Sequence, residues 1–286
     1  MTASSQALRA TDIATTSVDG ATLTKTPEFE ELLAIIAERQ REFEELRHIP
    51  RDVIALMKKA RIFRSATPTR FGGDALAPHH FLRMIDAIAT VDGSAAWVAA
   101  FGSANTYTAA LSVEAQEIMY RDGPDQVFAG GLHPVQEAVR VGGGWRVSGQ
   151  WKFASGCMGA DWIGVGIAGR REGESADAPP VVMMAVAPAE EVEIIETWDV
   201  SGMQGTGSHD TRVRDKFYSD AWICERGAPV FSMIFSIAIR RWPIRPRFTP
   251  PATSVWRAPR SIRRYRSPEP PRSWLAIQDS ATGAIF

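Results

Sequence analysis

The sequence has few of the features that mark secreted, metal-binding or membrane proteins. Its two cysteines, Cys157 and Cys224, are too few for a disulfide framework and lack the paired spacing of a zinc site, so we expect reduced thiols and no metal centre. No apolar run approaches the roughly 18 residues of a membrane-spanning helix, and residues 1–27 lack the apolar core of a secretory signal. We therefore expect a cytoplasmic protein without a membrane anchor.

Lysine is absent from the end of the chain. From Phe231 to Phe286 there are ten arginines, eight prolines and only two acidic residues, although the net charge of the whole chain is -1. Because proline interrupts helices and strands, we expect residues 227–286 to form an irregular tail. Such a tail is typical either of a basic arm that binds nucleic acid or membrane, or of a coding sequence read in a shifted frame. We favour the shifted frame, so nucleic acid is not an expected partner; an intact reading frame would contradict this.

The composition of the rest is that of a globular protein. With 45% apolar and 23% charged residues, the chain is neither collagen-like nor wholly disordered. Its 286 residues exceed the usual size of one domain, which favours two structural units. Residues 1–26 have few large apolar side chains and no periodicity, so we expect a disordered lead-in there.

Apolar residues recur at helical spacing over residues 27–124, which predicts an N-terminal helical domain. Glu28 and Glu30 suit the first turn of a helix that starts at Pro27, and Ser112 is a typical N-cap. The predicted helices cover residues 27–46, the segment after Pro50, residues 78–91, residues 94–111 and residues 112–120.

The hydrophobic period changes to two after Pro124, which predicts a β domain over residues 125–226. Three glycines, residues 142–144, supply a hairpin turn before a strand that carries Trp151 and Phe153. Further strands are predicted at residues 163–167, 181–186, 192–195 and 213–218. Helices followed by strands predict an α+β fold with a small antiparallel barrel or sandwich, and no parallel sheet of the Rossmann type.

The end of the predicted hairpin is the most informative stretch for chemistry. There the strand presents Phe153, the backbone of Ala154 and the Ser155 hydroxyl, and Gly156 lets another group approach closely. A ring, a hydroxyl and backbone amides can hold a flat heteroaromatic cofactor. The alternative is an ordinary hairpin whose Trp and Phe fill a core, and from this stretch alone we would favour the core.

Five blocks stand in a definite order along residues 27–226. They are Phe71-Gly72-Gly73, Asp92–Trp97, Gly130–Pro134, Trp151–Gly156 and Trp198–Ser208. In this order, the sequence resembles the acyl-CoA dehydrogenase superfamily, and within it the branch of two-component flavin-dependent monooxygenases that hydroxylate aromatic compounds. The resemblance implies an acyl-CoA dehydrogenase-like fold, a flavin cofactor and a set of site residues.

The resemblance assigns most of these residues to the flavin. It implies that the ring lies against Phe153, Ala154 and Ser155, with the Ser155 hydroxyl near N5 as the catalytic group. It implies that the pyrimidine edge lies along Gly131, Leu132 and His133, and that a flavin phosphate accepts from Thr206 and Ser208. For His133 a partly exposed loop histidine is as good an interpretation, and for residues 205–208 a structural turn between strands is equally open.

Three further residues are implied to face the substrate: Asn105, Tyr107 and Trp198. Members of this branch often carry a histidine on the helix of Asn105 and Tyr107, and this sequence has none there. We therefore do not expect a histidine to deprotonate a phenolic substrate at that point.

The resemblance implies the oxygenase component of a two-component monooxygenase. Such a protein hydroxylates an aromatic or heteroaromatic small molecule with O₂ and with reduced FMN or FAD from a separate flavin reductase. The family also has a C-terminal helical bundle that builds a homotetramer, and nothing after Pro229 resembles it, so we expect a C-terminally truncated or frameshifted chain in which that bundle is missing. The alternatives are an acyl-CoA dehydrogenase with bound FAD and an inactive fragment with a basic tail.

Overall fold

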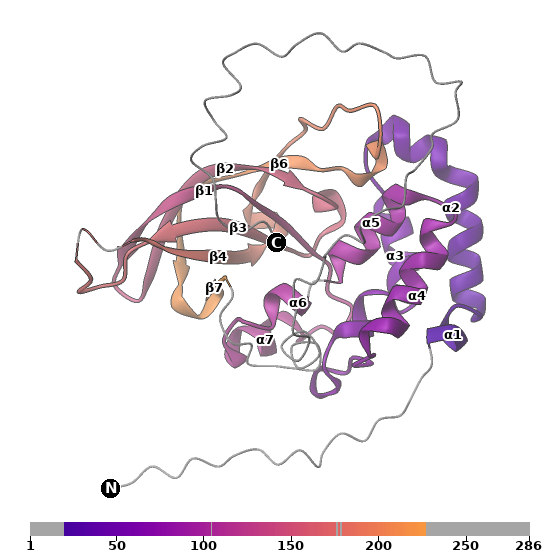
Figure 1. Ribbon diagram of the computed structural model, residues 1–286, viewed down its shortest axis with the longest axis horizontal. Coiled ribbons are helices and arrows are strands. Elements are labelled where there is room, and N and C mark those ends of the chain that lie inside the picture. Colours follow the sequence, from indigo (N-terminus) through magenta and orange to yellow (C-terminus); the bar gives the residue numbers. More distant parts are fainter. Residues whose placement is uncertain (1–19, 104, 176, 178, 227–286) are drawn as a thin grey trace, which may run out of the picture. The chain divides into compact units, whose positions relative to one another are not determined.

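Helices form the first part of the described chain and strands the second, which confirms the predicted α+β organisation (Figure 1). The computed structural model describes residues 20–103, 105–175, 177 and 179–226, all of them in one compact unit of the chain. The helices are α1 (Gly20–Leu23), α2 (Pro27–Leu46), α3 (Arg51–Lys59), α4 (Pro78–Ala89), α5 (Gly93–Gly102), α6 (Asn105–Thr108) and α7 (Val113–Met119). The strands are β1 (Phe128–Val141), β2 (Gly144–Ala154), β3 (Trp162–Gly169), β4 (Val181–Pro188), β5 (Glu193–Ile195), β6 (His209–Ser219) and β7 (Ile223–Glu225). The predicted tail, residues 227–286, lies outside the described residues.

Helix α2 begins at Pro27 as predicted, because Thr26 caps it. The Phe29 N–H donates to Thr26 Oγ1 over 3.3 Å. Structure nevertheless starts earlier, since α1 lies inside the predicted lead-in and its Leu23 is buried. The prediction of disorder over residues 1–26 is therefore wrong from residue 20 onward, since Leu23 packs against the helical core. The sequence did not reveal this, because no periodic pattern surrounds that single leucine. Among the helices of the described residues, none is both long and apolar enough to cross a membrane.

The helix predicted over residues 94–111 is divided in two. Helix α5 ends at Gly102, and Asn105 begins the separate helix α6. At the break the Ser103 hydroxyl donates to Ala99 O over 2.9 Å and lies 3.3 Å from Ile62 O, so it competes with the backbone for helix hydrogen bonds. The contact with Ile62 joins distant parts of the chain, and helical spacing alone does not reveal it.

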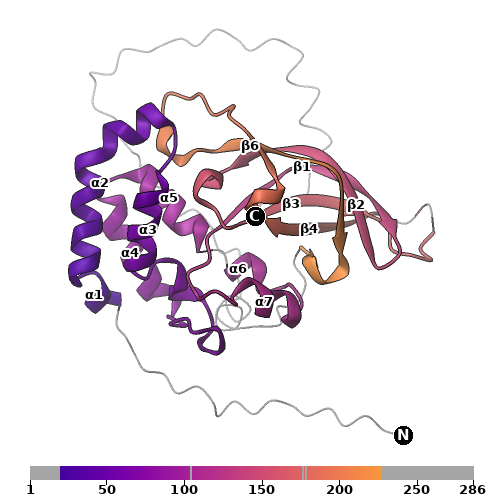
Figure 2. The ribbon, with the colours of Figure 1, turned by 180° about the vertical axis from the view of Figure 1, so that it is seen from behind.

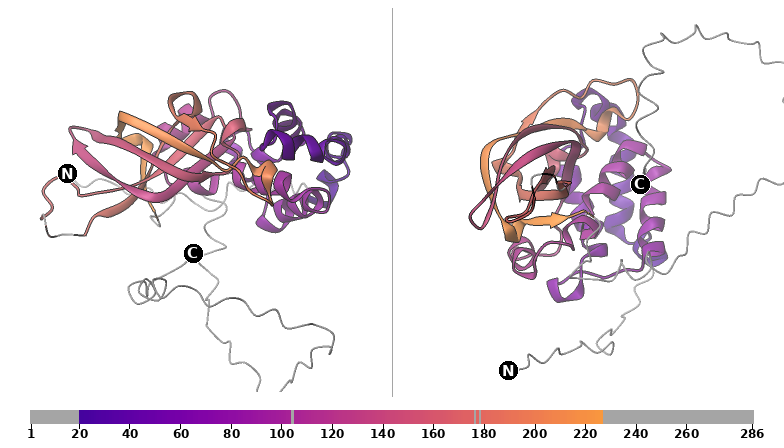
Figure 3. Two further views of the ribbon diagram at one scale, coloured as in Figure 1. Left: turned by 90° about the horizontal axis from the view of Figure 1, so that it is seen from above. Right: turned by 60° about the vertical axis from the view of Figure 1, so that its left-hand side comes forward.

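The strands form one mixed, curved sheet beside the helices (Figures 2 and 3). Its seven strands follow the order β5-β6-β2-β1-β3-β4-β7 and leave the sheet open. The β1–β2 hairpin turns at the predicted glycines, with Val141 opposite Gly144. The prediction of an antiparallel barrel or sandwich is wrong in two respects, since β1 and β3 pair in parallel and β5 and β7 remain as edges. The parallel pair arises because residues 155–161 cross the start of β1 before β3 begins. Both cysteines are free, as predicted, and both are buried.

Asp161 fastens this crossing connection to the sheet and to helix α3. Its Oδ2 accepts from the buried Val127 N–H over 2.8 Å and from Lys58 Nζ over 2.7 Å. The main chain of Val127 also accepts from the N–H groups of Asp161 and Trp162. One carboxylate therefore holds the start of β1, the connection and α3 in register.

We expect Asp161→Ala to lower the free energy of unfolding by about 1–3 kcal/mol, because it leaves the Val127 N–H without an acceptor. Asp161→Asn keeps an oxygen that can accept from Val127, so its loss is expected to be smaller. Unfolding in urea measures both. The control is Glu45→Ala, which removes the exposed Arg41–Glu45 pair and is expected to change stability by less than about 0.5 kcal/mol. Equal losses for Asp161→Ala and Glu45→Ala would contradict this role of Asp161.

Candidate functional site

The last residues of β2 leave the regular alternation of a strand. Trp151 lies opposite Thr211 of β6 and Ala154 lies opposite His209, so β2 uses one residue more than β6 and contains a bulge. Within the bulge Phe153 has a positive φ of 63°. Trp151 is fully buried and its indole N–H donates to Gly166 O over 2.7 Å, whereas the Phe153 side chain is 57% exposed. The spacing-two pattern places these two rings on one face, but the bulge turns Phe153 outward.

Ser155, directly after β2, belongs to a line of hydroxyl groups. Its Oγ lies 2.8 Å from Ser208 Oγ, and Ser208 Oγ lies 2.8 Å from Thr206 Oγ1. Thr206 Oγ1 donates to Met203 O over 2.9 Å, and the indole N–H of Trp97 on α5 donates to Ser155 Oγ over 3.1 Å. We call this series, from Trp97 through Ser155, Ser208 and Thr206 to the Met203 carbonyl, the hydroxyl chain. All three hydroxyl residues are buried, and Ser155, at 8%, is the most exposed of them.

The loop before β6 brings a second aromatic ring to Phe153. This loop reaches across to helices α2 and α5 (Figures 1 and 2). In it Trp198 meets Phe153 edge-on, with ring centroids 6.2 Å apart. The Trp198 indole N–H donates to Met203 O over 3.3 Å. Arg47, which follows α2, donates to Trp198 O over 3.3 Å. The Phe153 ring therefore stands between solvent and a loop that is fixed at several points.

Two glycines let the hydroxyl chain approach the helices. A Cβ on Gly205 would lie 3.0 Å from the Cβ of Phe43 on α2 and 3.1 Å from that of Ser94 on α5. Gly156 has a φ of 75°, and a Cβ there would lie 3.3 Å from a methyl group of Val98. Both positions favour glycine, one for space and one for backbone conformation.

The remaining predicted flavin residues lie on β1 or in the core. Gly131 is buried, and a Cβ there would lie 2.9 Å from the Cβ of Trp151. Leu132 is half-buried, and the exposed His133 lies opposite Lys152 of β2. Ala154 is fully buried and its side chain packs in the core of the sheet. Residues 131–133 therefore lie on β1, next to the end of β2 that carries the bulge.

The residues predicted to face a substrate are divided between two places. Trp198 lies against Phe153, as described. Asn105 and Tyr107 lie on α6 and not on the helix that carries Trp97, which corrects their predicted placement on one helix. The Tyr107 side chain is 41% exposed and its ring stacks on Phe128 at the start of β1, with centroids 5.9 Å apart.

Sequence reasoning missed two residues of this region. Trp97 closes one of the five resembling blocks, which was the only signal for it, and its role as a hydrogen-bond donor to Ser155 depends on the fold. His209 is 2% exposed, and its Nδ1 accepts from the Trp198 N–H over 3.1 Å. The ring is therefore the tautomer with hydrogen on Nε2, and this Nε2 has no hydrogen-bond partner among the described residues.

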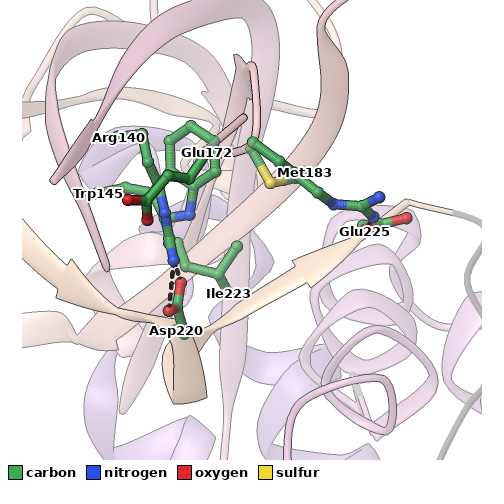
Figure 4. Close-up of a pocket in the computed structure, with 8 residues that line it drawn as sticks. Arg140, Trp145, Glu172, Met183, Asp220, Ile223 and Glu225 are labelled. Atoms are coloured by element: carbon green, nitrogen blue, oxygen red, sulfur yellow. Dashed lines mark hydrogen bonds and ion pairs between the residues drawn. The ribbon is translucent and has the colours of Figure 1, made fainter. Parts of the chain in front are cut away.

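The two arginines that line a surface hollow elsewhere are both paired with carboxylates. The hollow, of about 340 Å³, is lined by Arg140, Trp145, Arg171, Glu172, Met183, Asp220, Ile223 and Glu225 (Figure 4). Arg140 binds Asp220 through both carboxylate oxygens and lies over Trp145, and Arg171 pairs with Glu225. None of the predicted site residues lines it, and its ion pairs stabilise the junction of strands, so we assign it no function.

The His209 ring predicts how stability depends on pH. Burial lowers the pKa of His209 below its ordinary value of 6.5; nearby Arg47 and His48 lower it further, while Glu196 and Asp210 act in the opposite direction. Below pH 6.5 the unfolded chain therefore binds more protons at this residue than the folded protein. We expect the free energy of unfolding to fall as the pH drops below 6.5, and His209→Asn to reduce this dependence. The measurement is urea unfolding across pH, with the exposed His79→Asn as a control whose profile matches the wild type; an unchanged profile in His209→Asn would contradict the assignment.

The bulge gives a second expectation, about stability. Trp151→Ala empties a core position and is expected to cost about 3–5 kcal/mol. Phe153→Ala removes a ring that is mostly exposed and is expected to cost less than about 1 kcal/mol. Thermal or urea unfolding compares them. A loss of several kcal/mol in Phe153→Ala would show that the ring is a core residue after all.

Comparisons with known proteins identify relatives of the chain as a whole. No protein-family model matches the chain. The indole-3-acetate monooxygenase of Pseudomonas putida is 46% identical over 207 residues, which are 72% of this chain and 52% of that protein. The oxygenase component of an FADH(2)-dependent resorcinol hydroxylase from Rhizobium sp. (strain MTP-10005) is 32% identical over 181 residues, 62% of this chain and 43% of that protein.

A solved structure shares the arrangement of helices and strands. The HsaA monooxygenase of M. tuberculosis superposes with a TM-score of 0.66 at 28% identity, over 72% of this chain and 56% of that one. The chain spans about half the length of the curated relatives that it matches. The chain therefore belongs to the family of these monooxygenases, which includes flavin-dependent oxygenase components.

Proposed function

We propose that this chain forms part of the oxygenase component of a two-component monooxygenase, which hydroxylates an aromatic or heteroaromatic small molecule. The observation that carries the proposal is the end of β2, where an exposed Phe153 ring stands beside the buried hydroxyl of Ser155. The named relatives support it, since the two sequence relatives act as flavin-dependent or aromatic-compound monooxygenases by their names.

The residues at this site fit a flavin. A flavin ring system is flat and apolar on its faces, with nitrogen and oxygen atoms along one edge. The site offers two partly exposed rings, Phe153 at 57% and Trp97 at 45%, with the Ser155 hydroxyl bonded to one of them. A reduced flavin bound there would supply the electrons that activate O₂ for transfer to the substrate.

In this proposal each group of the chain has a separate task. Phe153 and Trp198 cover a face of the flavin ring, and the Ser155 hydroxyl bonds to its polar edge. The backbone of Gly131, with Leu132 and His133, borders the ring from the neighbouring strand. Thr206 and Ser208 hold Ser155 in place, because their hydroxyls are buried and bonded within the hydroxyl chain, rather than reaching a phosphate.

The remaining parts of the proposal concern the partners. A separate flavin reductase would deliver reduced FMN or FAD, in keeping with the name of the resorcinol hydroxylase component. The exposed Tyr107 and the half-buried Trp198 are proposed to border the aromatic substrate. Assembly into a homotetramer, a truncated or frameshifted C-terminus and a cytoplasmic location remain predictions from the sequence.

The test is a titration of the full chain with reduced FMN and FAD under nitrogen, followed by mixing with O₂ and indole-3-acetate as a probe substrate. We expect Ser155→Ala to weaken binding of reduced flavin by about tenfold and to divert O₂ from product to hydrogen peroxide, because the hydroxyl no longer fixes the ring. Ser148→Ala, on the exposed face of the same strand, is the matched control and is expected to behave as the wild type.

Two outcomes would contradict the proposal. If the full chain binds no flavin in either redox state, it is an inactive fragment. If it oxidises an acyl-CoA with a dye as electron acceptor and produces no hydroxylated product, it is an acyl-CoA dehydrogenase.

A further inference from the structure

The segment that carries Trp198 is attached to β6 by two hydrogen bonds beyond the end of β5. Strand β5 ends with Ile195 opposite Asp210. After it, the Asp210 N–H donates to the Thr197 hydroxyl over 3.1 Å, and the Trp198 N–H donates to His209 Nδ1 over 3.1 Å. The attachment of Trp198 to the sheet therefore uses a side chain, where β5 uses the main chain.

Four contacts hold Trp198 in its place. Its N–H donates to His209, its carbonyl accepts from Arg47, its indole N–H donates to Met203 O, and its ring meets Phe153 edge-on. An arginine, a main-chain carbonyl and a phenyl ring keep their state between about pH 5 and pH 8, whereas an ordinary histidine changes its charge in this range. Among these contacts, the one with His209 therefore depends on pH.

The surroundings of His209 accept its neutral ring and oppose its charged one. The side chain is 2% exposed, and its Nε2–H has no acceptor among the described residues. In the neutral ring Nδ1 accepts from Trp198, but in the charged ring both nitrogens carry a hydrogen and neither can accept. The Nδ1–H would then face the Trp198 N–H. A buried charge without hydrogen-bond partners is costly, so protonation favours an arrangement in which the ring reaches water.

Several ionisable groups face this ring from different elements. They are Glu196 in the loop, Asp210 on β6, and Arg47 and His48 after α2. The Cys157 thiol faces the main chain of His209, and burial raises its pKa to about 12, so it stays neutral. Burial lowers the pKa of His209 below 6.5, and Glu196 has the opposite effect because its carboxylate favours the charged ring.

We propose that His209 is a pH-sensitive switch for the loop before β6. Its neutral ring holds Trp198 against Phe153, and its protonation releases residues 196–199 and opens the side of Phe153 that Trp198 occupies. His209 is thus a positioning residue that acts through Trp198. All of the contacts involved lie within the chain, so the switch needs no ligand and does not depend on the proposed function.

The size of the effect follows from the two environments of the ring. In the released state the ring is in water with the ordinary pKa of 6.5, whereas burial keeps its pKa lower in the held state. The held state therefore loses stability as the pH falls below 6.5. The ratio of released to held molecules is expected to rise by up to about tenfold for each pH unit, until the pH passes below the pKa of the held ring.

The experiment is fluorine NMR of the full chain labelled with fluorotryptophan, from about pH 8 to about pH 5. Trp198→Phe identifies the signal of Trp198, and Trp151→Phe identifies that of the fully buried Trp151, which is the internal reference. We expect the Trp198 signal to move toward that of free fluorotryptophan below pH 6.5 while the Trp151 signal stays. A joint movement of both signals would show unfolding of the whole fold and would contradict a local switch.

Two substitutions of His209 separate its role as acceptor from its titration. The amide oxygen of an asparagine can take the place of Nδ1 and does not titrate, so His209→Asn is expected to keep Trp198 held over the whole range. His209→Ala removes the acceptor, so the released signal is expected already at about pH 8.

Two further variants test the surroundings of the ring. Glu196→Gln removes a charge that favours the protonated ring, so the transition is expected to move to lower pH. His79→Asn replaces an exposed histidine and is the control, with a transition that matches the wild type.

Three results would overturn the switch. They are a Trp198 signal that does not respond to pH, a response of unchanged size in His209→Asn, and a held Trp198 in a His209→Ala protein whose circular dichroism shows that it is folded. No flavin is present in the experiment, so each of these results leaves the proposed function as it stands.

Discussion

The bulge at the end of β2 is the constraint on which the candidate site depends. Without it, regular alternation would place Phe153 beside Trp151 in the core and turn Ala154 outward. The extra residue reverses this order, so that Ala154 is fully buried and Phe153 is 57% exposed. It also ends the strand with a bend that points the next hydroxyl, that of Ser155, toward α5 and the loop before β6. The exposed ring and, two residues later, the inward hydroxyl are consequences of the same local distortion.

This arrangement explains why three buried hydroxyls can coexist beside an apolar core. A buried hydroxyl without a partner costs about 1–3 kcal/mol, so a line of them is stable only when each hydrogen has an acceptor. Here the Met203 carbonyl accepts at one end and Trp97 donates at the other. Each of the three hydroxyl hydrogens then has an acceptor, and Ser155, the hydroxyl residue with the largest exposed fraction, keeps a second lone pair that no donor among the described residues occupies. The hydrogen bonds among the buried hydroxyls thus determine which hydrogen-bonding position of Ser155 a ligand can use.

The sequence predicts local features of this structure well where neighbouring residues cause them. The Ser112 cap of α7, with Ala115 N–H donating to its hydroxyl, and the glycine turn of the β1–β2 hairpin are examples. The stretch that ends at Ser155 was assigned to a site only through the family resemblance, since its residues alone favoured an ordinary hairpin core. Features that depend on distant partners could not be predicted. Ser103 ends α5 with the help of Ile62, and the parallel pairing of β3 with β1 depends on Asp161 and Val127.

The components of the site come from three separated segments, and their cohesion follows from contacts outside it. Trp97 lies on α5, Ser155 follows β2, and Thr206 and Ser208 precede β6. Gly205 allows the loop to pack against α2 and α5, while Lys58 and Asp161 fix α3 to the connection that leaves Ser155. Because hydrogen bonds weaken steeply with small changes in distance and angle, the direction of the hydroxyl chain persists only while helices and sheet keep this register. The helices and the sheet therefore both contribute partners to the Ser155 hydroxyl oxygen, Trp97 from α5 and Ser208 from the loop before β6, and neither part alone fixes its hydrogen bonds.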